Sequence, residues 1–218
     1  MAQFGPVLTA MVTPFTPGGE LDLEAAQNLA RYLVVNGNDG VVVAGTTGEA
    51  PTLSHDEQAQ LITAVREALP DDTVIAGTGS NDTRAAIHNT ERATEAGADG
   101  ILVVTPYYNR PSQAGIELHM REVAKATDKP VILYDIPVRT GRKIETDTLL
   151  RLAEVDNVVA IKDAAGDPAE TARLLSLAGG AYEIYSGDDS LTLPLLSVGA
   201  VGVIGVATHW VGKQMSEM

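Results

Sequence analysis

The side chain with the clearest chemical potential is Lys162, because it alone among the five lysines ends an apolar, β-branched run, Val158-Val159-Ala160-Ile161. Burying an ammonium group is costly unless the group is paired or deprotonated. Desolvation lowers the pKa of a lysine and makes the neutral amine available for attack on a carbonyl at neutral pH. A strand-end lysine paired with Asp163 or with a helix carboxylate fits the same pattern. From the residues alone, both interpretations stay open.

Three further segments hold polar groups that suit a small carboxylated substrate. The turn Gly45-Thr46-Thr47-Gly48-Glu49 sets two hydroxyls among flexible glycines, a good seat for a carboxylate or simply an ordinary turn. Tyr134 ends the apolar run 131–133, where its hydroxyl is either satisfied in the core or free to carry protons. Arg139 could bind a carboxylate through two N–H groups or pair on the surface.

These residues follow apolar runs that are typical of buried parallel strands. Such runs begin near Val7, Gly40, Val74, Ile101, Val131, Val158, Glu183 and Gly202. Each is continuously apolar, as expected of strands buried on both faces. Helical segments lie between most of them, with start signals at Ser54, Asp82, Ser112 and Asp167. The alternation predicts an α/β fold, a (β/α)8 TIM barrel. An open doubly wound sheet is the rival, but eight strands and the lack of a G-x-G-x-x-G motif argue against it.

The 218 residues suffice for one large domain, and no linker suggests a second. Barrels of this type commonly run to ~250 residues. The eighth helix, expected to start near Thr208, would stop at Met218. We therefore expect a single barrel domain over residues 1–218, truncated in or after its eighth helix.

Catalytic groups of such barrels lie at the carboxyl ends of the strands. This rule selects Thr46, Thr47, Glu49, Tyr107, Tyr108, Tyr134, Asp135, Arg139, Lys162, Asp163, Asp188 and Asp189. The four histidines show no ligand spacing, so no metal site is expected.

The composition restricts the class of partner. A net charge of -14, with no Lys/Arg cluster, argues against nucleic acid and against an anionic membrane surface. The absence of cysteine excludes disulfides and thiolate chemistry. No signal peptide or membrane-length apolar run is found, so a cytoplasmic location is expected.

Five segments in register resemble the dihydrodipicolinate synthase/N-acetylneuraminate lyase family, from about Gly5 to Val206. They are GTTGE at 45–49, TPYYNRP at 105–111, YDIPVRTG at 134–141, IKDA at 161–164 and SGDD at 186–189. The resemblance implies a class I aldolase that holds pyruvate as an imine on Lys162 and needs no cofactor. It implies that Tyr134 shuttles protons and that Thr46 links Tyr134 to Tyr108. In this family Tyr108 usually comes from a neighbouring subunit, so a homo-oligomer, dimer or tetramer, is expected.

The same resemblance assigns substrate binding. Thr47 and backbone near Gly187 and Ile204 would hold the carboxylate of pyruvate. Arg139 and the double threonine favour the synthase branch, in which the arginine holds the carboxylate of L-aspartate 4-semialdehyde. The expected reaction is the condensation of these two substrates to 4-hydroxy-tetrahydrodipicolinate, on the route to diaminopimelate and lysine.

Two alternatives are kept: a lyase of the same family acting on a sugar acid, and a truncated barrel that binds a keto acid without turnover. The family's C-terminal helices are expected to be absent here. Members inhibited by lysine often carry polar residues where this chain has Ala50, Pro51 and Ala85, and a histidine where it has Gln58. The resemblance therefore leaves inhibition by lysine open.

Overall fold

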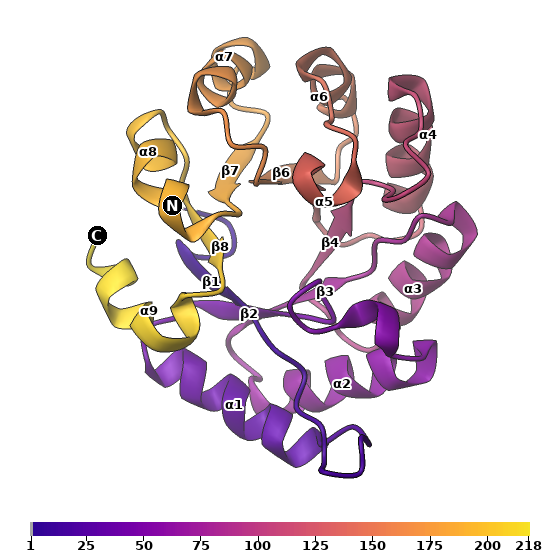
Figure 1. Ribbon diagram of the computed structural model, residues 1–218, viewed down its shortest axis with the longest axis vertical. Helices are drawn as coiled ribbons and strands as arrows, with labels where there is room; N and C mark the ends of the chain where they lie inside the picture. The colour runs from indigo at the N-terminus through magenta and orange to yellow at the C-terminus, as the bar shows by residue number, and fades with distance from the viewer. Residues whose placement is uncertain (1) are drawn as a thin grey trace.

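The computed structural model describes residues 2–218, and its centre is a closed barrel of eight parallel strands paired in sequence order (Figure 1). The strands are β1 (Val7–Ala10), β2 (Gly40–Val43), β3 (Thr73–Gly77), β4 (Gly100–Val104), β5 (Val131–Asp135), β6 (Val158–Asp163), β7 (Glu183–Ser186) and β8 (Gly202–Gly205). Each begins within one residue of the start predicted from its apolar run. The predicted (β/α)8 barrel is confirmed.

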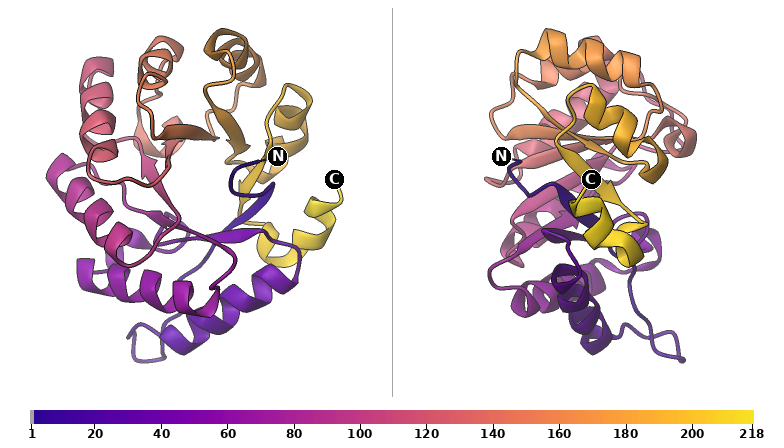
Figure 2. Two further views of the ribbon diagram at one scale, coloured as in Figure 1. Left: turned by 180° about the vertical axis from the view of Figure 1, so that it is seen from behind. Right: turned by 90° about the vertical axis from the view of Figure 1, so that its left-hand side faces the viewer.

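Helices form a ring outside the strands, as Figures 1 and 2 show. They are α1 (Leu23–Val35), α2 (His55–Ala68), α3 (Thr83–Glu95), α4 (Gln113–Ala124), α5 (Pro137–Thr140), α6 (Thr146–Leu152), α7 (Pro168–Ala178), α8 (Thr192–Ser197) and α9 (Thr208–Ser216), with single 3-10 turns η1 (Ala50–Thr52) and η2 (Asp189–Leu191). None of the helices within residues 2–218 has both the length and the apolar character needed to cross a membrane.

Four of the outer helices begin at the caps that the sequence predicts. Ser54 and Glu57 form a reciprocal capping box at the start of α2, with N–H···O distances of 3.2 and 2.8 Å. The side chains of Asp82, Ser112 and Asp167 accept backbone N–H groups at the starts of α3, α4 and α7. Each cap of this kind stabilises a helix by about 1 kcal/mol. Local sequence therefore sets where these strand-to-helix loops end.

Apolar side chains form two layers, one inside the barrel and one between strands and helices. Every strand contributes to the inner layer, which includes Leu8, Val42, Ile75, Leu102, Ile132, Ala160, Tyr185 and Ile204. Val41, Val131, Ile161 and Ile184 belong to the outer layer. Because both faces of every strand are buried, the strands are apolar without alternation.

Strand geometry decides which polar groups at the carboxyl ends face the barrel interior. Side chains alternate between the two faces of a strand. Tyr134 lies two residues after Ile132, and Lys162 lies two residues after Ala160, so both share the inner face. Asp135 and Asp163, the next residues along each strand, point toward the helix layer. The fold thus separates an inner amine–phenol pair from an outer pair of carboxyls.

Candidate active site

Lys162 is buried inside the barrel, with 5% of its surface exposed. Burial lowers the pKa of its amine to about 8, and the negative charge of Asp189 offsets part of that effect. No carboxylate within residues 2–218 lies within ion-pair distance of its Nζ atom. The structural interpretation, a lysine paired with Asp163 or a helix carboxylate, is therefore wrong. At pH 7 roughly a tenth of such an amine is neutral, far more than for an ordinary lysine.

Tyr134 lies beside Lys162 because the two residues are direct partners in the β5–β6 ladder. Its ring centroid is 4.3 Å from the Lys162 Nζ atom. Burial raises the pKa of Tyr134 to about 12, and the charge of Arg139 counteracts part of that rise. The hydroxyl donates to no other group of residues 2–218, so it is free for a substrate or a proton relay.

The end of β7 closes over Lys162 from the other side. Gly187 lies so near that a Cβ atom placed on it would be 3.0 Å from the Cγ of Lys162 and from the Cβ of Ala164. Asp189, two residues later, accepts backbone N–H groups of Val206 and Ala207 through its carboxylate. The carboxylate that most affects Lys162 thus also anchors the segment after β8.

The Gly45–Glu49 turn presents unused hydrogen-bond donors at the end of β2. Within residues 2–218, the backbone N–H groups of residues 45–48 and the side-chain hydroxyls of Thr46 and Thr47 donate no hydrogen bond. Ala44, just before the turn, and Glu49, its last residue, have φ of 51° and 57°, where L side chains are strained. A turn held in a strained shape with free N–H groups suits an anionic ligand.

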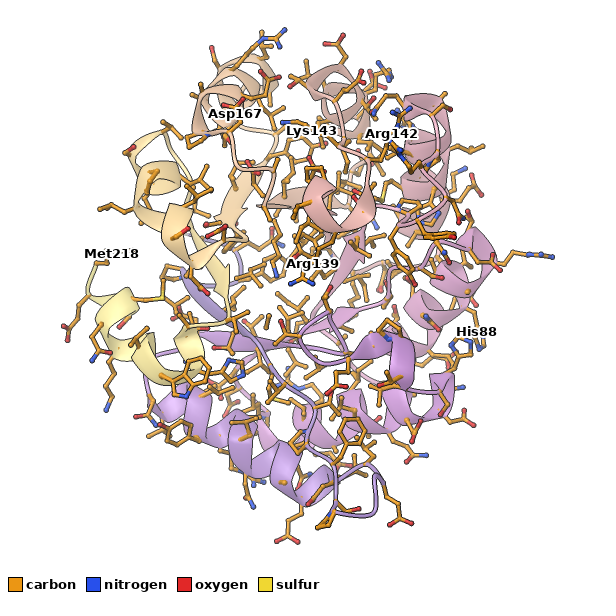
Figure 3. The ribbon with its side chains drawn as sticks, in the orientation of Figure 1. His88, Arg139, Arg142, Lys143, Asp167 and Met218 are labelled. Atoms are coloured by element: carbon orange, nitrogen blue, oxygen red, sulfur yellow. The ribbon has the colours of Figure 1, made fainter. Side chains whose placement is uncertain are left out.

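Arg139 projects from the short helix α5 over the open end of the barrel, as Figure 3 shows. It is exposed, and none of the ion pairs within residues 2–218 includes it. Its guanidinium is therefore available for a carboxylate that enters the barrel.

A cavity of about 400 Å³ joins several of these groups at the carboxyl end of the barrel. Thr46, Tyr134 and Arg139 line it. Lys162 does not, but its Nζ atom lies against the ring of Tyr134, which does. The cavity extends toward α2 and α3, where Ala50, Pro51, His55, Gln58, Ala85 and Asn89 complete its wall. The four positions for which the resemblance left inhibition by lysine open are therefore all cavity residues.

The two adjacent tyrosines of the loop after β4 face different surroundings. Tyr107 lines the cavity, whereas Tyr108 is 89% exposed and has a left-handed φ of 68°. Tyr108 is thus not brought to Lys162 by its own chain. Its assignment as a catalytic residue stays a prediction that requires a second copy.

The remaining predicted residues, Ile204 and Thr47, come from β8 and from the turn after β2. Ile204 is fully buried in β8, opposite Leu8 of β1. Thr47 is half-buried in the turn after β2. Among residues 2–218 no cluster of three or more His, Asp or Glu side chains could hold a metal ion.

Two features of the site were not predicted from the sequence: a hydrogen-bonding role of Asp189 and a polar residue in the cavity wall. The link between Asp189 and the segment 205–207 was not foreseen, although Asp189 was on the list of strand-end candidates. Asn89 in the cavity wall was also missed, because it lies on a helix, whereas Gln58 was named only through the family resemblance. The Asn89 side-chain oxygen is buried without a partner within residues 2–218, but one sequence carries no sign of this.

Comparisons with known proteins find the same family over nearly the whole chain. The model of the dihydrodipicolinate synthetase family matches residues 3–218. A 4-hydroxy-tetrahydrodipicolinate synthase of Acidothermus cellulolyticus is 57% identical over 218 residues, which are all of this chain and 70% of that protein. A dihydrodipicolinate synthase structure from Bacillus anthracis superposes with a TM-score of 0.97 at 45% identity, covering 100% of this chain and 75% of that one. One from Acinetobacter baumannii, complexed with pyruvate, gives a TM-score of 0.95 at 41% identity and covers 99% and 74% of the two chains.

Proposed function

Because the chain belongs to the dihydrodipicolinate synthetase family, we propose that Lys162 holds pyruvate as an imine and adds it to L-aspartate 4-semialdehyde. The activity is the one for which the curated relatives are named, the synthesis of 4-hydroxy-tetrahydrodipicolinate in lysine biosynthesis. The observation that carries the assignment of the site is the buried, unpaired amine of Lys162 beside the ring of Tyr134.

The chemistry follows from a neutral amine next to a neutral phenol. The amine of Lys162 attacks the ketone carbon of pyruvate, and loss of one water gives the imine. Loss of a methyl proton converts the imine into an enamine, whose carbon attacks the aldehyde carbon of the semialdehyde. The amine of the semialdehyde then attacks the imine carbon, closes the ring and releases Lys162. Tyr134 carries the protons, and Thr46 connects it to Tyr108 of a second copy.

Two sets of donors hold the two carboxylates. Thr47 and the unused N–H groups of its turn bind the carboxylate of pyruvate, with backbone near Gly187 and Ile204 completing the seat. Arg139 binds the carboxylate of the semialdehyde from the mouth of the barrel, since a guanidinium can make two parallel N–H···O bonds.

The amine of Lys162 supplies the activation that a cofactor provides in other enzymes, so the proposed reaction calls for none. Both substrates are small molecules that carry a carboxylate, and the protein acts as a homo-oligomer because Tyr108 completes the site of a neighbouring copy. The expected cytoplasmic location stays a prediction.

Reduction with borohydride in the presence of pyruvate tests the imine directly. We expect one reduced pyruvate adduct per chain, located on Lys162 by peptide mass spectrometry. The Lys162→Ala variant and a sample without pyruvate serve as controls. An unmodified Lys162 in a folded sample would refute the proposal, and so would an adduct on one of the other four lysines.

Replacement of Arg139 separates the synthase from a sugar-acid lyase. In Arg139→Ala we expect the KM for the semialdehyde to rise at least tenfold, because a paired carboxylate contact is lost. Pyruvate trapping on Lys162 should change little. The lyase alternative is not favoured, since relatives of 50–57% identity over nearly the whole chain are named as synthases.

A further inference from the structure

The segment that carries Arg139 is a closed loop between β5 and Ile144. It leaves the strand at Ile136, forms the single turn α5, and reverses at Gly141, whose φ of 75° favours glycine. Thr140 is buried, and its hydroxyl lies 3.1 Å from the carbonyl oxygen of Ile136 and 2.8 Å from that of Arg142. The Thr140 hydroxyl therefore links the start and the end of the loop next to Arg139.

The base of this loop is closed by Asp135. One oxygen of its carboxyl accepts the backbone N–H of Ile144 at 3.2 Å, across nine residues of chain. Both residues are buried, with 3% of Asp135 exposed. The backbone carbonyl of Asp135 also accepts the N–H of Ala164 at 2.9 Å, which ties the same residue to the end of β6. Asp135 thus joins the loop to the two strands that hold Tyr134 and Lys162.

We propose that Asp135 is a positioning residue for the second substrate, because its carboxyl fixes the 136–143 loop and thereby holds Arg139 over the barrel mouth. Asp135 itself faces the helix layer and touches neither Lys162 nor the cavity. The inference rests on the proposed function of Arg139 and adds the element that orients it.

The surroundings of Asp135 indicate that its oxygen matters more than its charge. Burial raises its pKa to about 7, the Ile144 N–H and the charge of Lys143 lower it, and Asp163 raises it further. Near neutral pH the carboxyl is therefore present in both forms. Either form keeps an oxygen that accepts the Ile144 N–H. An uncharged side chain of the same shape should consequently replace it.

Three variants of Asp135 test this inference. Asp135→Ala removes the hydrogen-bond acceptor, and Asp135→Asn keeps one. Asp135→Leu also lacks an acceptor but fills a similar volume, so it controls for the cavity that alanine would leave. We expect Ala and Leu to raise the KM for the semialdehyde on the order of tenfold, since small misplacements of a binding group carry large kinetic costs. The rate of pyruvate trapping on Lys162 should stay within about twofold. Asp135→Asn should behave nearly as the unmodified protein.

A matched control lies at the other end of the barrel. Asp39 also closes a loop through its carboxylate, which accepts the backbone N–H of Val7 at 2.8 Å. Asp39→Ala should lower the thermal midpoint without a selective change in the KM for the semialdehyde.

Adding Arg139→Ala provides the decisive comparison. If Asp135 acts through Arg139, Asp135→Leu in the Arg139→Ala background should raise the KM no further. Additive effects would overturn the inference. It would also be overturned if Asp135→Asn were as impaired as Asp135→Leu, or if pyruvate trapping fell as much as the reaction with the semialdehyde. Absence of trapping in the unmodified protein would instead contradict the proposed function itself.

Discussion

Burial acts on Lys162 and Tyr134 in the same chemical sense, because it favours the neutral form of each. It lowers the pKa of the amine to about 8 and raises that of the phenol to about 12. A neutral amine is the nucleophile that imine formation needs, and a neutral phenol can donate a proton. The β5–β6 register sets the two groups side by side, so one packing arrangement prepares both.

The rate of pyruvate trapping should follow the ionisation of Lys162. Below its pKa the amine is charged and cannot attack, and above it the amine is neutral. We therefore expect the trapping rate in the presence of saturating borohydride to rise with pH and level off above about 8. Measurement by mass spectrometry between pH 6 and 10 gives the inflection. A rise that continues to the pKa of an ordinary lysine would contradict the assignment of Lys162 as a desolvated amine.

The Tyr134 hydroxyl should matter for turnover and not for packing. Tyr134→Phe keeps the ring beside the Lys162 Nζ atom and removes only the proton carrier. General acid–base groups contribute about 10²- to 10⁴-fold, so we expect kcat to fall by at least ~100-fold.

Tyr185 offers the matched control for that substitution. It lies inside the same barrel, but its hydroxyl contacts Glu183 and the backbone N–H of Phe4. Tyr185→Phe should lower the thermal midpoint and leave kcat near that of the unmodified protein. Equal losses of kcat in both variants would argue that Tyr134 acts only through the stability of the barrel interior.

Among single residues, Lys162 could be predicted as a site residue from the sequence, because a charge that ends an apolar strand has few explanations. It also lists Asp135 and Asp189 among strand-end residues, but their roles depend on backbone N–H groups nine and seventeen or more residues away. Such contacts are set by how loops return to the barrel. No periodicity or cap encodes that return, so their function could not be predicted.

The elements differ in how well the sequence predicts them. Every strand was predicted because burial on both faces gives it an uninterrupted apolar run. The short helix α5 and the 3-10 turns η1 and η2 were not predicted, since three or four residues are too few for a helical period. These short turns occupy the carboxyl end of the barrel, where they carry or flank site residues. The least predictable elements are thus those closest to the chemistry.

The approach of β7 to β6 gives a prediction for Gly187. A methyl group there would lie 3.0 Å from the Lys162 Cγ atom and from the Ala164 Cβ atom, tighter than ordinary van der Waals contact. Gly187→Ala should displace Lys162 and slow pyruvate trapping on the order of tenfold. Overpacking should also lower the free energy of unfolding by about 1–3 kcal/mol.

A second glycine distinguishes this crowding from a general effect of adding a methyl group. At Gly18 a Cβ atom would meet only the Thr16 hydroxyl, at 3.6 Å. Gly18→Ala should leave the trapping rate and the thermal midpoint unchanged. Normal trapping in Gly187→Ala would show that the β7 end tolerates a side chain and does not fix the position of Lys162.

At the scale of the whole molecule, the net charge is negative, whereas the groups proposed to bind substrate are hydrogen-bond donors or cations. The chain carries a net charge of -14, yet each proposed substrate must be held by its carboxylate. The groups that would meet them are Arg139 at the mouth, free N–H groups after β2 and the amine of Lys162. Recognition therefore depends on local donors and not on overall attraction. This arrangement explains why composition alone excluded polyanionic partners but gave no substrate.

The proposed sharing of Tyr108 between two copies can be tested by subunit complementation. Tyr108 is 89% exposed in its own chain, and the Tyr134 hydroxyl has no partner within residues 2–218. If Tyr108 serves the site of a second copy, Tyr108→Phe and Lys162→Ala homodimers are each impaired. A mixed dimer pairs the intact Lys162 site of one chain with the intact Tyr108 of the other, so it contains one complete site.

Random pairing makes half of the dimers mixed, each with one working site of two, and activity should recover to about a quarter of the unmodified level. Activity is measured after the two variants are refolded together, with size-exclusion chromatography to verify association. If Tyr108 acted within its own chain, a mixed dimer would contain no complete site. The mixture would then show only the average of the two variants, and the shared site would be ruled out.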